Sequence, residues 1–250
     1  MRILILGGTA QARELAAELC ARDEHRIILS LAGRTGETAL PVPSGSRLRV
    51  GGFGGADGLA AYLRSESIDV LIDATHPFAG AISENAAAAS IESGIRLLAL
   101  RRPPWQARPG DRWTHVPDVV TAAAHAAKLA DGLCVFVTTG RLEARAYASD
   151  QQHTYLIRTV TAPDGPLPPH HTLVFDRGPY TVAGETELMA RHDVAALVTK
   201  NSGGTSTSAK LTAARQRGIP VIMVDPPALP ASGEVYFEVA EVVRQVIAIT

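Results

Sequence analysis

The chain has 250 residues, of which 46% are hydrophobic and 20% are charged, and its formal net charge is −1. This balance predicts a globular protein of one large or two ordinary-sized domains, and the lack of a basic block argues against nucleic acid as a partner. No apolar stretch is long enough for a membrane span and no signal peptide is recognisable, so we expect a cytoplasmic protein. The histidines lack metal-ligand spacing and Cys20 and Cys134 form no C-x-x-C pair, so we expect no metal site.

The first twenty residues predict a strand, a tight turn and a helix. The apolar run from Ile3 to Leu6 is too short for a helix and ends at two glycines, after which apolar residues follow at helical spacing. Such a turn directs the N–H groups of a helix N-terminus at an anion, typically a phosphate. Thr9 replaces the middle glycine of the dinucleotide pattern G-x-G-x-x-G, and its hydroxyl is a candidate phosphate donor. An ordinary first strand of a parallel α/β domain fits the same pattern. The predicted phosphate-binding residues are Gly7, Gly8, Thr9, Ala10 and Gln11.

A second turn follows the next predicted strand, where a dinucleotide fold holds the adenosine ribose. Gly33 and Arg34 occupy this turn, and the first acid after the strand is Glu37. A guanidinium there suits a 2′-phosphate because its planar fork pairs with phosphate oxygens, so we predict NADP(H) rather than NAD(H). A solvent-exposed turn arginine is the alternative. In a third glycine-rich loop, the backbone at Gly52 and Phe53 is expected to approach the ligand.

Strands and helices alternate along the chain, which predicts an α/β fold with parallel, doubly wound sheets. Residues 101–117 interrupt the alternation with clustered Pro, Trp and Arg. We expect this segment to end a first domain over 1–117 and to lead into a second α/β domain over 118–250, with a cleft between them. The closing helix is predicted to begin at Glu234 and to pack either on the second domain or back on the first.

Ligands of open α/β sheets bind beyond the carboxyl ends of the strands, and several such ends carry functional groups. Thr75 and His76 follow one buried strand, and His76 is expected either to orient a nicotinamide amide or to cap the next helix, whose first position we assign to Pro77. In the second half, a Lys, an Asn and a Ser/Gly run supply a cation, amide donors and exposed N–H groups that suit carboxylates or phosphate. Lys200 could also deliver a proton, while a solvated lysine in a flexible loop fits the same pattern.

Other common chemistries find no support in the sequence. None of the tyrosines is followed by a lysine four residues later, which argues against a short-chain dehydrogenase. No carboxylate pair, G-x-S-x-G elbow or P-loop lysine motif is present, so glycosidase, hydrolase and ATPase reactions are not predicted.

Several segments together resemble the precorrin-6A reductase family of cobalamin biosynthesis, and they span nearly the whole chain. The sequences D-A-T-H-P-F-A and K-N-S-G-G are the most specific of them. The resemblance implies two Rossmann-like domains and an NADPH-dependent oxidoreductase that reduces a ring-contracted, porphyrin-type tetrapyrrole, precorrin-6A, to precorrin-6B. The segments are Ile3–Leu15, Asp73–Ala79, Thr139–Arg141, Asp176–Pro179 and Thr199–Gly204.

This resemblance predicts how the two halves divide the reaction. NADPH is expected on the first domain, with its nicotinamide near Thr75 and His76, and hydride passes directly to a macrocycle carbon. The tetrapyrrole is expected in the interdomain cleft, with Lys200 as proton donor or as a clamp on a substrate carboxylate. Neighbouring pathway enzymes are expected to hand over the substrate. The alternatives are a non-catalytic NADP(H)-binding redox sensor and a two-domain nucleotide-sugar transferase. The predicted substrate-binding residues are Thr139, Gly140, Arg141, Asn201, Ser202, Gly203 and Gly204.

Overall fold

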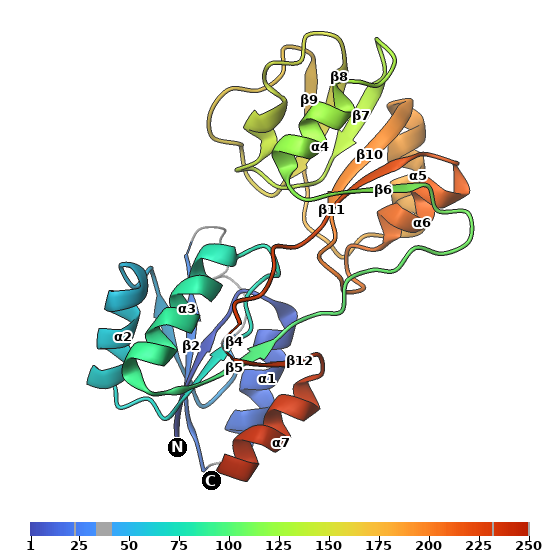
Figure 1. Cartoon of the computed structure of the whole chain (residues 1–250). Helices are drawn as coiled ribbons and strands as arrows, with labels where there is room; N and C mark the ends of the chain where they lie inside the picture. The colour runs from blue at the N-terminus through green and yellow to red at the C-terminus, as the bar shows by residue number, and fades with distance from the viewer. Residues whose placement is uncertain (23, 34–41, 232, 250) are drawn as a thin grey trace. The chain divides into compact units, whose positions relative to one another are not determined.

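The computed structural model describes residues 1–22, 24–33, 42–231 and 233–249, and it contains two compact units, each built on a six-stranded parallel sheet (Figure 1). The first unit comprises Met1–Pro103 and Pro227–Thr250, and the second comprises Pro104–Pro226. This architecture confirms the predicted α/β class with two parallel sheets. The chain crosses between the units at residues 103/104 and 226/227, which differs from the expected boundary at residue 117.

The first unit takes five strands and three helices from the described residues up to 100, and the end of the chain completes it. Its elements are β1 (Arg2–Leu6), α1 (Ala10–Cys20), β2 (Arg26–Leu31), β3 (Ser46–Val50), α2 (Gly55–Ser65), β4 (Val70–Asp73), α3 (Gly80–Ser93), β5 (Arg96–Leu100), β12 (Glu234–Tyr236) and α7 (Val239–Ile249). The strand order is β12-β5-β4-β1-β2-β3. The direction in which strands are added therefore reverses between β1 and β4, and sheets of this kind bind their ligands at that point.

Helices cover both faces of this sheet, with α1 and α7 on one face and α2 and α3 on the other (Figure 1). Ile3 and Ile5 pack in one cluster with α1 and α7, whereas Leu4 and Leu6 pack in another with α2 and α3. Because both faces of β1 are buried, its sequence is a continuous apolar run rather than an alternation of apolar and polar residues.

The predicted start of the closing helix at Glu234 is wrong. Glu234–Tyr236 forms β12, which pairs with β5, and the amide of Arg101 donates to the carbonyl of Tyr236 at 2.9 Å. The helix α7 begins at Val239 and packs in the same apolar cluster as α1. This short segment forms a strand because the unpaired backbone groups at the edge of β5 are available as hydrogen-bond partners. Likewise α3 begins at Gly80, and Pro77 lies in the turn before it.

The second unit has the same arrangement of strands as the first, except that its edge strand β6 comes first in the chain rather than last. Its elements are β6 (Trp113–Val116), α4 (Val119–Ala126), β7 (Cys134–Val137), η2 (Ala144–Tyr147), β8 (Thr154–Thr159), β9 (His171–Phe175), α5 (Val182–Arg191), β10 (Val194–Lys200), α6 (Ala209–Gln216) and β11 (Val221–Val224). The strand order β6-β11-β10-β7-β8-β9 reverses between β7 and β10. Strand β6, which the sequence analysis placed in an irregular boundary segment, pairs with β11 at the edge of the sheet.

A buried ion pair fixes the carboxyl ends of β4 and β5. The Arg101 guanidinium contacts one oxygen of the Asp73 carboxylate and donates to the Ser83 hydroxyl at 3.0 Å. The other carboxylate oxygen accepts from the amide and the hydroxyl of Thr75, at 3.1 and 2.6 Å. Burial of Asp73 disfavours its charged form, but the attraction of Arg101 and these hydrogen bonds outweigh burial and hold the pKa of Asp73 below its usual value.

Neutralising this carboxylate is expected to destabilise the first unit. Asp73→Asn leaves the Arg101 guanidinium buried without a charged partner, which should lower the free energy of unfolding by about 3–5 kcal/mol in a denaturant titration. The control Asp131→Asn, at an exposed turn, should change it by less than about 0.5 kcal/mol.

The pair also predicts a dependence of stability on pH. Because the folded-state pKa of Asp73 lies below its ordinary value, its contribution is complete above about pH 4 and is lost as the pH falls through the folded-state pKa. The wild-type protein should therefore lose stability in acid more steeply than Asp73→Asn. Equal stability of the two proteins at neutral pH would contradict the assignment.

Candidate functional site

The glycine turn after β1 lies at the reversal point of the first sheet. The amide of Gly7 donates to the carbonyl of Ser30 at 2.8 Å, and a Cβ at Gly7 would lie 2.8 Å from Leu29 Cδ1, so only glycine fits there without a shift. Gly8 has a φ of 110°, in the region that favours glycine. The turn therefore brings the start of α1 close to the sheet.

Thr9 links the two loops at the reversal point. Its hydroxyl accepts from the amide of Ala12 at 3.0 Å as the N-cap of α1, and it donates to the carbonyl of Ala74 at 2.9 Å. The single hydroxyl proton is thus used within the protein. The hydroxyl of Thr9 was a candidate phosphate donor, but in this structure it joins the loop after β1 to the loop after β4.

The first turn of α1 offers its backbone to an anion. The N–H groups of Ala10 and Gln11 have no acceptor within the helix, because the first turn of an α-helix has no preceding carbonyls. The first turn contains no acidic side chain. The side-chain amide of Gln11 donates to the carbonyl of Phe237 at 3.4 Å, so Gln11 offers its backbone N–H to a ligand. These groups fit the phosphates of a dinucleotide.

Gly33 lies two residues after the end of β2, at the same edge of the sheet. Its φ is 76°, and a Cβ there would lie 2.8 Å from Val50 Cγ1, so the turn requires glycine. Arg34, which the sequence analysis assigned to the 2′-phosphate, lies outside the described residues.

An arginine that the sequence analysis missed shapes the neighbouring loop. Arg49, at the end of β3, donates to the carbonyls of Gly51 and Gly52 at 2.6 and 2.8 Å, and its guanidinium lies 3.6 Å from the centre of the Phe53 ring. The conformation of the backbone at Gly52 and Phe53 therefore depends on Arg49. Its position two residues before the pair Gly51 and Gly52 was the available signal.

The loop after β4 carries the predicted nicotinamide contacts. The Thr75 hydroxyl donates to Asp73, while Nδ1 of His76 accepts from the amide of Phe78 at 3.2 Å. The carbonyl of His76 accepts from Ala79 at 2.8 Å. His76 therefore stabilises the turn before α3. It does not cap the helix, whose N-cap is Ala79 without a side-chain hydrogen bond, and a contact with nicotinamide stays a prediction.

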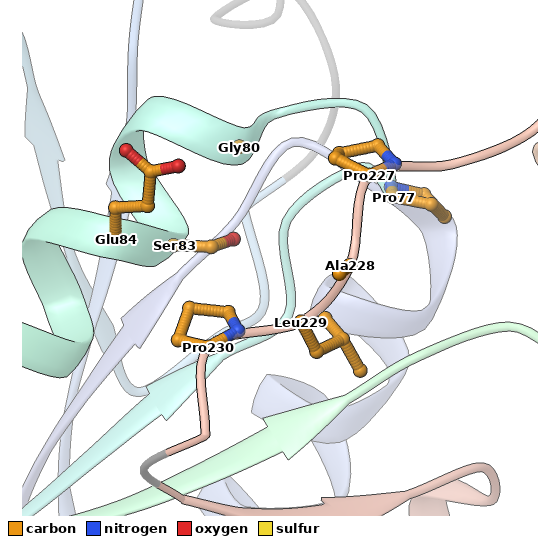
Figure 2. Close-up of a pocket in the computed structure, with 8 residues that line it drawn as sticks. All are labelled: Pro77, Gly80, Ser83, Glu84, Pro227, Ala228, Leu229 and Pro230. Atoms are coloured by element: carbon orange, nitrogen blue, oxygen red, sulfur yellow. The ribbon is translucent and has the colours of Figure 1, made fainter. Parts of the chain in front are cut away.

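A small pocket lies beside this turn (Figure 2). Figure 2 shows Ser83 pointing from α3 toward the segment 227–230, and Ser83 is also the residue that accepts from Arg101. The walls are mostly proline and aliphatic side chains with one ionisable group, Glu84, so the pocket differs in chemistry from the phosphate-type turn. Its lining residues are Pro77, Gly80, Ser83, Glu84, Pro227, Ala228, Leu229 and Pro230.

In the second unit, an ion pair joins the two loops at the reversal point. Lys200 Nζ, at the end of β10, lies 2.6 Å from Oε1 of Glu143, which follows β7. The side chains are 15% and 31% exposed. Gly140 has a φ of 107°, and a Cβ there would lie 3.3 Å from Glu143 Oε2. The sequence analysis selected Lys200 and Gly140 but missed Glu143.

Trp105 holds the loop that follows Lys200. The Trp105 amide donates to Oδ1 of Asn201 at 2.7 Å, Nδ2 of Asn201 donates back to the Trp105 carbonyl at 3.3 Å, and the indole N–H donates to the carbonyl of Gly204 at 2.8 Å. The side chain of Asn201 therefore positions the loop. Gly203 and Gly204 both have positive φ, at 64° and 81°, which turns the backbone sharply after the nearly buried Ser202.

Two further predicted residues lie on the loop after β7. Arg141 is 3.6 Å from the carboxylate of Asp164, which is 73% exposed. The buried hydroxyl of Thr139 has no hydrogen-bond partner within the described part of the chain, and the same holds for Tyr147.

The structure thus brings predicted residues together at the reversal point of each sheet, while Gly33, Gly52 and Phe53 follow the neighbouring strands β2 and β3. Within the described ranges, no group of His, Cys, Asp and Glu side chains could hold a metal ion, and no helix is long and apolar enough to cross a membrane. The reversal point of the first sheet offers backbone N–H donors, and that of the second offers side-chain cations beside a carboxylate.

Comparisons with known proteins agree with these features. A family model described as precorrin-6x reductase CbiJ/CobK matches residues 2–247. The precorrin-6A reductase of Rhodococcus erythropolis is 48% identical over 249 residues, which cover 100% of this chain and 98% of the relative. The cobalt-precorrin-6A reductase of Methanothermobacter thermautotrophicus is 28% identical over 247 residues, covering 95% of this chain and 80% of the relative.

A solved structure described as CobK precorrin-6A reductase matches with a TM-score of 0.87 and 43% identity, over 99% of this chain and 96% of that chain. The family match, the identity to the relatives and the shared structure each extend over nearly the whole sequence. The chain therefore belongs to the precorrin-6x reductase family, CbiJ/CobK.

Proposed function

We propose that this chain reduces precorrin-6A to precorrin-6B, with NADPH as the hydride donor. The observation that carries the proposal is which functional groups lie at the reversal point of each sheet. One presents a helix N-terminus without acidic residues, and the other presents Lys200 paired with a carboxylate. These loops contain most of the segments through which the sequence resembles the reductase family, and the relative from Rhodococcus erythropolis is named precorrin-6A reductase.

The first unit is the proposed cofactor site. The N–H groups of Ala10 and Gln11 bind the phosphates, and the glycines before them let the ligand approach the backbone. Arg34 pairs with the 2′-phosphate, which distinguishes NADPH from NADH. When bound, a reduced nicotinamide supplies the hydride that a reductase requires. Thr75 and His76, held in place by Asp73 and by the turn before α3, border its ring.

The second unit is the proposed site for the tetrapyrrole. Arg141 and the backbone of Ser202, Gly203 and Gly204 pair with the carboxylates of the substrate. Thr139 and Gly140 lie on the same loop as Arg141 and complete this contact. Lys200 donates the proton that accompanies the hydride.

The relatives also favour a cobalt-free substrate. Those named precorrin-6A reductase are 47% and 48% identical to this chain, whereas those named cobalt-precorrin-6A reductase are 26% and 28% identical. A non-catalytic NADP(H) sensor would need no proton donor, and a nucleotide-sugar transferase would need no hydride donor, so neither alternative accounts for the whole chain.

Direct hydride transfer is tested with NADPH deuterated at C4. Anaerobic incubation with precorrin-6A should consume the nicotinamide absorbance and place deuterium on a macrocycle carbon, as mass spectrometry and NMR of the product would show. Tight NADPH binding without turnover, with cobalt-precorrin-6A reduced instead, would overturn the assignment of the cobalt-free substrate. Turnover of neither compound would favour the sensor.

The cofactor preference is tested with Arg34→Ala. A charge-assisted contact with phosphate contributes about 1.5–3 kcal/mol, so the affinity for NADPH should fall about 10- to 100-fold while the affinity for NADH stays unchanged. Titration of cofactor binding by nicotinamide fluorescence gives both constants, with the exposed Arg22→Ala as control. An equal loss for both cofactors would contradict a contact with the 2′-phosphate.

The role of Lys200 is tested with Lys200→Ala. Loss of a general acid should lower kcat by about 10²- to 10⁴-fold without changing the affinity for NADPH. The exposed Lys128→Ala, in the same unit, should match the wild type. An unchanged kcat with a raised KM for precorrin-6A would instead show that Lys200 only clamps a substrate carboxylate.

A further inference from the structure

Glu143 and Lys200 meet because of the sheet topology. Strands β7 and β10 are neighbours in register, with Phe136 opposite Leu197 and Val137 opposite Val198. The loop after β7 and the last residue of β10 therefore lie at the same edge, and the carboxylate oxygen of Glu143 reaches the ammonium group of Lys200 at 2.6 Å. The sequence separates the two residues by 57 positions.

The surroundings of Glu143 are asymmetric. On the protein side lie Gly140, whose added Cβ would be 3.3 Å from Oε2, and the buried hydroxyl of Tyr147, which is close enough to interact with the charge of Glu143. Burial raises the pKa of Tyr147, and the negative charge of Glu143 raises it further, so this phenol keeps its proton. On the other side, Glu143 is 31% exposed, against 15% for Lys200. The carboxylate is therefore the more accessible member of the pair.

The pair argues against a carboxylate clamp at Lys200. A substrate carboxylate that approached Lys200 would also meet the negative charge of Glu143, and like charges at such short range repel each other. A proton donor needs an ammonium group held in one position and a route by which its proton is replaced. The ion pair with Glu143 holds the ammonium group in position, and the exposure of Glu143 provides the route for the proton.

We propose that Glu143 is a positioning residue that acts through Lys200 in the reduction. It fixes the ammonium group, and it returns a proton from solvent to Lys200 after each turnover. This inference rests on the proposed function of the chain, since it assumes that Lys200 donates a proton to the macrocycle.

The proposed step balances in atoms and charge. The macrocycle gains a hydride at one carbon as the C4–H bond of NADPH breaks, which oxidises the cofactor to NADP⁺. It gains a proton at a neighbouring position as an N–H bond of Lys200 breaks, which leaves a neutral amine. A proton from water then binds the Glu143 carboxylate and moves to the amine, which restores the ion pair. The sum is one NADPH and one proton consumed for each macrocycle reduced.

The test uses Glu143→Gln, which keeps the size of the side chain and removes its charge and its capacity to carry a proton. We expect kcat to fall about 10- to 100-fold, with the KM for precorrin-6A and the affinity for NADPH within about twofold of the wild type. The solvent deuterium isotope effect on kcat should increase because proton transfer becomes rate-limiting. The control is Glu187→Gln, since Glu187 is 70% exposed in an ion pair with Arg191 and should leave both quantities unchanged.

A second variant distinguishes proton relay from a loss of structure. In Glu143→Ala, added acetate should restore part of the rate, because a small carboxylic acid can enter the space left by the side chain and carry the proton. In combination with Lys200→Ala, Glu143→Gln should cause no further loss, because both residues serve one step.

The outcomes separate this inference from the proposed function. If the wild-type protein reduces precorrin-6A but Glu143→Gln keeps its kcat and its solvent isotope effect, the role of Glu143 is overturned and the proposed function stands. A slowed Glu143→Ala that acetate does not rescue also overturns the relay. If the wild-type protein reduces no precorrin with NADPH, both proposals are overturned.

Discussion

The reversal of strand order at the centre of each sheet is the constraint on which the functional residues depend. The carboxyl ends of parallel strands lie at one edge of the sheet. Where the strand order reverses, the segments that follow the two adjacent strands run to opposite faces of the sheet. In the first sheet this occurs between β1 and β4, and in the second between β7 and β10. Residues far apart in the sequence are therefore neighbours at two defined places. The sixth strand of the first sheet, β12, comes from the separate segment Pro227–Thr250, whereas that of the second sheet, β6, is the first strand of the continuous segment Pro104–Pro226.

Buried polar groups connect loops, strands and helices in both units. In the first unit, Asp73 and Arg101 hold the end of β4, and the hydroxyl of Thr9 joins the two loops. The second unit buries Arg158 and Glu185 at 2.5 Å, close to Lys210, whose ammonium group lies 5.1 Å from the centre of the Trp105 ring. Burial and the nearby charge of Arg158 lower the pKa of Lys210 to about 7, against the opposing attraction of Glu185. Such groups contribute little net stability, but they allow few alternative loop conformations.

The two reversal points differ in chemistry in the way that the proposed reaction requires. The first presents uncharged backbone donors beside a helix N-terminus, which suits a phosphate without adding a proton donor. The second presents Lys200 and Arg141, each with a carboxylate partner, so its cations are already placed by the protein. An enzyme for hydride transfer has to orient two ligands and supply one proton. One reversal point suits the cofactor, and the other suits the substrate and offers the proton donor.

The sequence by itself determined the class of fold and the family. Apolar runs bounded by glycines specify buried parallel strands, and the segments after them carry the family motifs, because both signals lie within a few consecutive residues. Only the tertiary structure decided where Glu234–Tyr236 and β6 belong, since an edge strand of three or four residues has too little pattern of its own and is selected by the strand beside it. It also decided the partners of the predicted residues. Glu143 lies 57 positions from Lys200 and Trp105 lies 96 positions from Asn201, and no local pattern connects residues that only the packing of the sheet brings into contact.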